Sequence, residues 1–127
     1  MTRDKQLQNF IFHCNGNLKN AQKVLDDWEK KFDRNPLEAF TWSGPAFPAA
    51  AEVMVYKGVL ECMNSANEDK KWEVFEGLIR VMQSSVMHSA RYPEHSSSAT
   101  SNLASSAVTS VQAELVEKMQ WIIKEKE

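Results

Sequence analysis

The chain has 127 residues, of which 43% are hydrophobic and 25% are charged, and its formal net charge is -2. This length and composition are those of an ordinary globular protein with one core, which excludes a chain disordered throughout and predicts a single domain over residues 1–127. Without an excess of Lys and Arg, nucleic acid is a poor main partner, and no apolar run reaches the roughly 18 to 20 residues of a bilayer-spanning helix, so we expect no membrane association.

The first predicted helix begins after Thr2, whose side chain can cap it. Apolar residues then recur at i, i+3, i+4 and i+7, the spacing of one helical face: Leu7, Phe10, Ile11 and Cys14. The pair Asn15-Gly16 is typical of a left-handed helix stop, so we expect the helix to end there. Phe12 points away from the apolar face at this spacing, which makes it a candidate for an exposed aromatic.

A second helix is predicted from Asn17, a capping residue, to Arg34. Its apolar stripe is the clearest in the chain: Leu18, Ala21, Val24, Leu25, Trp28 and Phe32. Asn35 can cap a further helical segment, since it is followed by a proline and, three positions after Asn35, by Glu38. This pattern predicts a short helical turn that includes Trp42.

A third helix is expected over residues 46–64, with Pro45 and Pro48 in its first turn. Its polar residues form a narrow strip, Lys57, Glu61 and Asn64, and most of the remaining circumference is apolar. Such a helix is typically buried, and we expect it to be the central helix, wrapped by all the others. Glu52 lies opposite the strip, where it either benefits from the helix dipole or is a carboxylate inside an apolar layer.

The segment Ser65–Glu68 has the pattern of a capping box and predicts a fourth helix that ends at Tyr92-Pro93. A Ser-rich stretch at about 93–100 predicts a flexible loop, and a last, long helix is expected over 101–124. No alternating strand pattern occurs in the sequence. The predicted fold class is therefore all-α, a single-domain bundle of about five helices with a largely apolar central helix.

Residues with catalytic or metal-binding chemistry are few in this sequence. His13, His88 and His95 lack a second ligand at helical spacing, so we expect no metal site. Cys14 and Cys62 stand among apolar neighbours and no secretion signal precedes them, which predicts two reduced, buried thiols in a cytoplasmic protein. No phosphate-binding glycine loop or nucleophile motif is present. We therefore expect neither catalysis nor a cofactor.

One alternative function rests on His88 and Arg91, which resemble part of the phosphate-accepting motif of histidine phosphotransfer domains. In that family a histidine is followed three residues later by a basic residue and then by glycine, whereas Tyr92 follows here. The resemblance implies an all-helical phosphorelay protein in which His88 accepts the phosphoryl group. If it holds, replacing His88 with glutamine abolishes the activity.

Aromatic residues outnumber what the predicted core plainly needs, so they either serve as exposed anchors of a protein interface or fill the core at helix ends. The candidate partner-binding residues are Phe12, Trp42, Phe47, Tyr56 and Trp121. We expect a small non-catalytic interaction protein, an accessory subunit or inhibitor of a larger bacterial or phage protein machine. A homodimer, in which a second copy completes the third or the last helix, is compatible with this expectation.

A further alternative, a nucleic-acid-associated helical protein, requires one basic patch on the second predicted helix. Its basic residues are Lys19, Lys23, Lys30, Lys31 and Arg34. Asp26, Asp27 and Glu29 interrupt this series, so binding would have to show a steep salt dependence to support the alternative.

Overall fold

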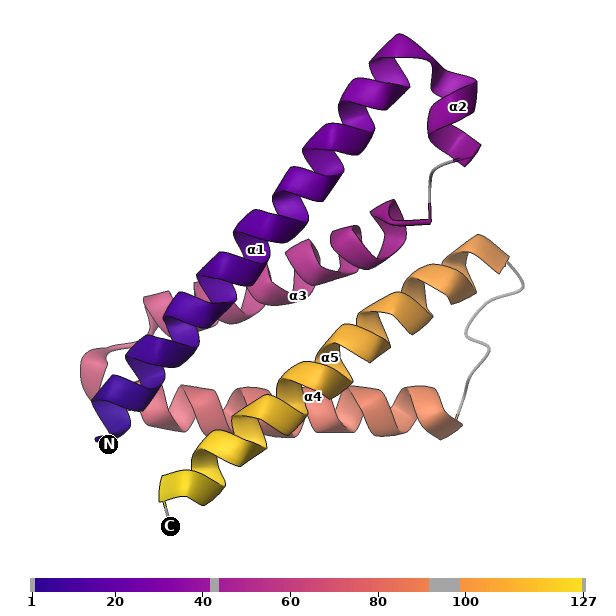
Figure 1. Cartoon of the computed structure of the whole chain (residues 1–127). Coiled ribbons are helices and arrows are strands. Elements are labelled where there is room, and N and C mark those ends of the chain that lie inside the picture. Colours follow the sequence, from indigo (N-terminus) through magenta and orange to yellow (C-terminus); the bar gives the residue numbers. More distant parts are fainter. Residues whose placement is uncertain (1, 42–43, 92–98, 127) are drawn as a thin grey trace.

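The computed structural model describes residues 2–41, 44–91 and 99–126. They form α1 (Arg3–Arg34), α2 (Pro36–Thr41), α3 (Ala46–Ser65), a 3-10 turn η1 (Glu68–Lys70), α4 (Lys71–Arg91) and α5 (Ala99–Lys126) (Figure 1). No strand occurs in these ranges. The all-α fold with five helices is confirmed.

The predicted break at Asn15-Gly16 is wrong, because α1 is one continuous helix of 32 residues. Cys14, two residues before Gly16, is buried. After Gly16, Leu18 packs against the core and Ala21 is buried. The apolar stripe thus stays in phase across Gly16, which has no positive φ. A helical glycine costs about 1 kcal/mol relative to alanine, and packing on both sides of it offsets that cost.

Two predicted helix caps, at the start of α1 and at the start of α2, are confirmed. The Lys5 backbone N–H donates to Thr2 Oγ1 at 3.3 Å, and the Glu38 backbone N–H donates to Asn35 Oδ1 at 3.3 Å. Trp28 Nε1 then donates to the Ala39 carbonyl at 2.9 Å, which holds α2 against α1.

The junction between α3 and α4 differs from the predicted capping box. Ser65 is the last residue of α3, and helical structure resumes only at η1, where the Asn67 side chain makes no capping bond. Lys71 Nζ instead donates to the Met63 carbonyl at 2.6 Å. An ammonium group therefore satisfies one of the free carbonyls at the end of α3, a role that the sequence pattern did not indicate.

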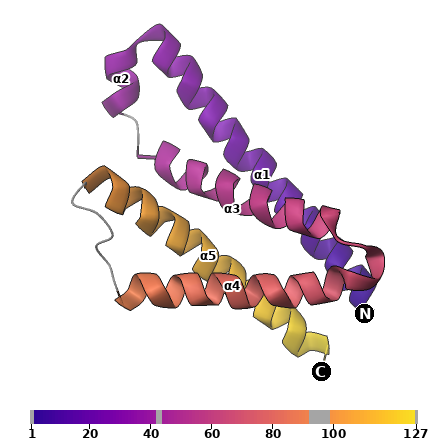
Figure 2. The ribbon, with the colours of Figure 1, turned by 180° about the vertical axis from the view of Figure 1, so that it is seen from behind.

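The helices form a bundle in which both termini lie at the same end (Figures 1 and 2). α3 contacts α1, α4 and α5, as expected of a central helix, and α2 contacts α1. The core between the four long helices has Phe75 of α4 at its centre, edge-on to Phe10 of α1 with 5.1 Å between ring centroids. The predicted loop at 93–100 lies outside the described residues up to 98, and α5 already begins at Ala99.

Candidate functional site

One face of α3 is left uncovered by the other described helices. Ala50, Met54, Gly58 and Cys62, four positions apart, are all exposed, and Met54 keeps 58% of its surface in water. We call this row the α3 ridge. The expectation that the apolar circumference of α3 is fully used is therefore wrong, and so is the expectation that Cys62 is a buried thiol.

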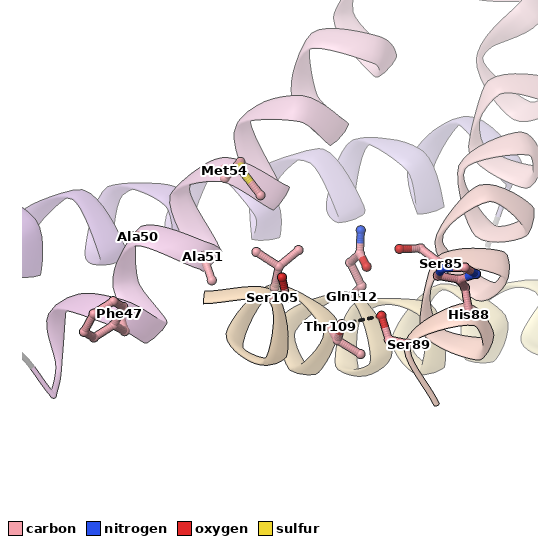
Figure 3. Close-up of a pocket in the computed structure, with 11 residues that line it drawn as sticks. Phe47, Ala50, Ala51, Met54, Ser85, His88, Ser89, Ser105, Thr109 and Gln112 are labelled. Carbon is pink, nitrogen blue, oxygen red and sulfur yellow. Dashed lines mark hydrogen bonds between the residues drawn. The ribbon is translucent and has the colours of Figure 1, made fainter. Parts of the chain in front are cut away.

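A groove with a volume of about 540 Å³ runs beside the ridge. One wall comes from α3, and the other comes from α4 and α5 (Figure 3). The α3 wall consists of Phe47, Ala50, Ala51 and Met54, and the opposite wall consists of Ser85, His88, Ser89, Ser105, Val108, Thr109 and Gln112. These residues include no Asp, Glu, Lys or Arg, so the groove combines an apolar wall with an uncharged hydrogen-bonding wall.

The hydroxyl and amide groups on the α4 and α5 wall differ in whether they have hydrogen-bond partners within the chain. Thr109 Oγ1 donates to Ser89 Oγ at 3.0 Å, a bond that links α5 to α4 (Figure 3). Gln112 Oε1 is buried and accepts no hydrogen bond. Such an unsatisfied buried acceptor costs about 1–3 kcal/mol. His88 is exposed at the same wall.

A second hollow, of about 790 Å³, lies on the α1 side of α3. Its lining residues are Asn15, Leu18, Lys19, Asn20, Gln22, Lys23, Asp26 and Lys57. Asp26 lies among the lysines, as the sequence indicated. The α3 ridge therefore stands between an uncharged groove on one side and a mixed-charge hollow on the other.

The predicted partner-binding aromatics fall into different places. Phe12 on α1 and Trp121 on α5 are exposed, at 81% and 61%. Phe47 lies in the wall of the groove. Tyr56 is buried, and Trp42 lies outside the described residues. Phe47 is thus the one aromatic of the predicted set that the described structure places in the groove.

The buried Tyr56 belongs to a polar network that joins α1, α3 and α5. Asn17 Nδ2 lies 3.1 Å from the Tyr56 hydroxyl oxygen, to which it donates, and 2.8 Å from His13 Nε2. Lys118 Nζ also donates to His13 Nε2. Because both neighbours of Nε2 are donors, this nitrogen is an acceptor and the neutral ring carries its proton on Nδ1. Burial, and secondly the Lys118 ammonium, lower the pKa of His13.

Two further groups beside this network have pKa values shifted from their ordinary ones. Burial raises the pKa of the Cys14 thiol to about 12, which makes it a poor nucleophile. Burial, and secondly Glu114, raise the pKa of Glu52. Glu52 is only partly buried, so it lies at the edge of the core and not inside an apolar layer.

Within the described ranges no three His, Cys, Asp or Glu side chains are grouped so that they could hold a metal ion. None of the helices described in these ranges is long and apolar enough to cross a membrane. No known protein family, curated protein or solved structure matches this chain.

Proposed function

We propose that this chain is a non-catalytic protein–protein interaction module that works as an accessory subunit or inhibitor of a larger protein assembly. The observation that supports the proposal is the open, uncharged groove beside the exposed α3 ridge. Covering such a surface with apolar side chains of a partner removes it from water, which is favourable at roughly 25 cal/mol per Å² of apolar area. The α3 ridge and the apolar wall would supply that binding energy.

The two walls of the groove also favour a particular kind of partner. The groove is bounded by helices on both sides, a setting in which amphipathic helices dock through their apolar face. The apolar face of such a helix would lie on Phe47 and Met54, and its flank would face the hydroxyl groups of the opposite wall. The apolar contacts would provide affinity, and the hydrogen-bonding wall would fix orientation.

Site-specific photo-crosslinking tests the proposal. A benzophenone amino acid in place of Met54 samples the groove, and the same amino acid in place of Val81 is the control, because Val81 is 67% exposed on α4 and does not line the groove. We expect a discrete protein adduct from position 54 and none from position 81. The adduct partner, identified by mass spectrometry, should then bind the purified Met54→Glu variant at least about tenfold more weakly than wild type.

The proposal is wrong if position 54 gives no adduct, or if both positions give the same adducts. His88→Gln separates it from the phosphorelay alternative, since an interaction module keeps its binding when this imidazole is lost. Incubation with phosphoramidate, followed by mass spectrometry at alkaline pH, should phosphorylate His88 no faster than a histidine in a short unstructured peptide. A much faster reaction at His88 would support the phosphorelay instead.

A further inference from the structure

The hollow on the α1 side of α3 gathers positive charge, although the chain as a whole carries a formal charge of -2. Lys19 and Lys23 of α1 and Lys57 of α3 line it, and all three are exposed. The carboxylate among the described lining residues is that of Asp26, whose Oδ1 accepts from Gln22 Nε2 at 3.2 Å. A volume of about 790 Å³ is in the range of clefts that hold a ligand. The hollow is therefore a candidate site for an anionic ligand.

The three lysines form no ion pair with the residues that the structure describes. Asp27 follows Lys23 by four residues, and Glu61 follows Lys57 by four, the spacing at which a lysine and a carboxylate can pair on a helix. Neither pair brings its nitrogen and oxygen within 4.0 Å of each other. The charge of these ammonium groups is therefore available to a partner.

The backbone around the hollow does not suit a single phosphate group. Proteins hold phosphates with free backbone N–H groups at helix starts and in tight loops, or with the planar fork of arginine. The described lining residues lie inside α1 and α3, where backbone N–H groups are bonded along the helix, and they include no arginine. Lysines are separate point charges on flexible stems, which suit carboxylates spaced along a chain.

The positions of the lysines match those of carboxylates on a helix. Lys19 and Lys23 are four residues apart, so about 6 Å separates them along the axis of α1. Glutamates four positions apart on a partner helix have the same spacing. Lys57 lines the hollow from α3, and Leu18, which packs against the core, adds an apolar contact.

We propose that the hollow binds an acidic helical segment of a partner protein, whose carboxylates pair with Lys19, Lys23 and Lys57. This surface goes beyond the proposed groove, since none of the three lysines lines the groove. Nucleic acid is charged along its whole length, so it would also bring phosphates to Asp26 and Asp27, one turn after the lysines. A peptide can place uncharged residues there.

Fluorescence anisotropy measures the binding. The probe is a fluorescein-labelled helical peptide with glutamates four positions apart, and the control probe has glutamines in their place. Wild type should bind the glutamate peptide alone, and more weakly as the salt rises from about 50 to about 200 mM, because salt screens exposed charges. The hollow variant, Lys19→Gln/Lys23→Gln/Lys57→Gln, should bind this peptide about tenfold more weakly than wild type.

A second triple variant separates the hollow from the net charge of the chain. Lys5→Gln/Lys30→Gln/Lys124→Gln removes the same charge from exposed lysines that do not line the hollow, and it should weaken binding less than about twofold. Glutamine has nearly the helix propensity of lysine, so both variants should melt within a few degrees of wild type. A loss of binding would then not be unfolding.

No binding of the glutamate peptide by wild type, or an equal loss in the two triple variants, would overturn the inference. A short single-stranded RNA that binds more tightly than the peptide, and loses its binding in the hollow variant alone, would assign the hollow to nucleic acid and overturn it as well. Crosslinking from position 54 tests the groove separately, so the two proposals can fail independently.

Discussion

Replacing Phe75 with alanine tests whether the long helices share one core. Phe75 is fully buried in α4. Its ring lies edge-on to Phe10 of α1, at 5.1 Å and 82°, and 5.3 Å from the Trp72 ring. Arg3, at the start of α1, stacks over Trp72 at 4.9 Å. This aromatic cluster therefore joins the first helix of the chain to the fourth.

The expected cost follows from what the side chain contacts. Truncating a fully buried phenylalanine to alanine costs about 3–5 kcal/mol, from lost burial and the cavity that remains. Domains of this kind have about 5–15 kcal/mol of stability in total, so the alanine variant should unfold at a much lower urea concentration. Phe75→Leu keeps most of the volume and loses mainly the edge-on contact with Phe10, so it should cost about 1–2 kcal/mol.

Urea unfolding followed by circular dichroism measures both variants. Val81→Ala is the matched control, because Val81 lies on the same helix and is exposed; it should change the free energy of unfolding by no more than about 0.5 kcal/mol. A loss below about 1 kcal/mol for Phe75→Ala would refute the reasoning, since Phe75 could not then be at the centre of a close-packed core.

Three further results are expected. A thiol reagent should label Cys62 in the native protein, and should label the buried Cys14, with a pKa of about 12, only on unfolding. The lowered pKa of His13 favours the neutral ring in the folded state, so the free energy of unfolding should fall as the pH drops below 6.5 in urea titrations, and less so in His13→Gln. Trp121→Ala, at an exposed side chain, should leave the melting temperature within a few degrees of wild type.

For each of these three predictions, a different result would contradict the reasoning. Equal labelling rates of both thiols in the native protein would contradict the burial of Cys14. A fall in stability below pH 6.5 that is the same in His13→Gln would assign the effect to groups other than His13. Glu52 is not such a group, because its raised pKa stabilises the fold as the pH falls toward 4.5. A large loss of stability in Trp121→Ala would place this side chain in the core.

Local features of the chain were predictable because they depend on neighbours in sequence. The caps at Thr2 and Asn35, the apolar stripes and the all-α class follow from spacing and side-chain chemistry alone. The predicted break at Asn15-Gly16 does not occur. A glycine inside a helix costs only about 1 kcal/mol, and burial of Cys14 and Ala21 on either side outweighs this cost. The sequence shows both the signal and the stripe, but packing decides between them.

The candidate site was less predictable, since it depends on how many helices surround α3. A helix that is apolar on nearly all sides indicates burial, but it does not say that its own chain supplies every neighbour. α1, α4 and α5 cover most of α3 and leave the ridge from Ala50 to Cys62 exposed. Met54 in water and Gly58 beside empty space are both unfavourable in the isolated chain. A partner that covers this ridge, as proposed above, would account for a nearly all-apolar α3.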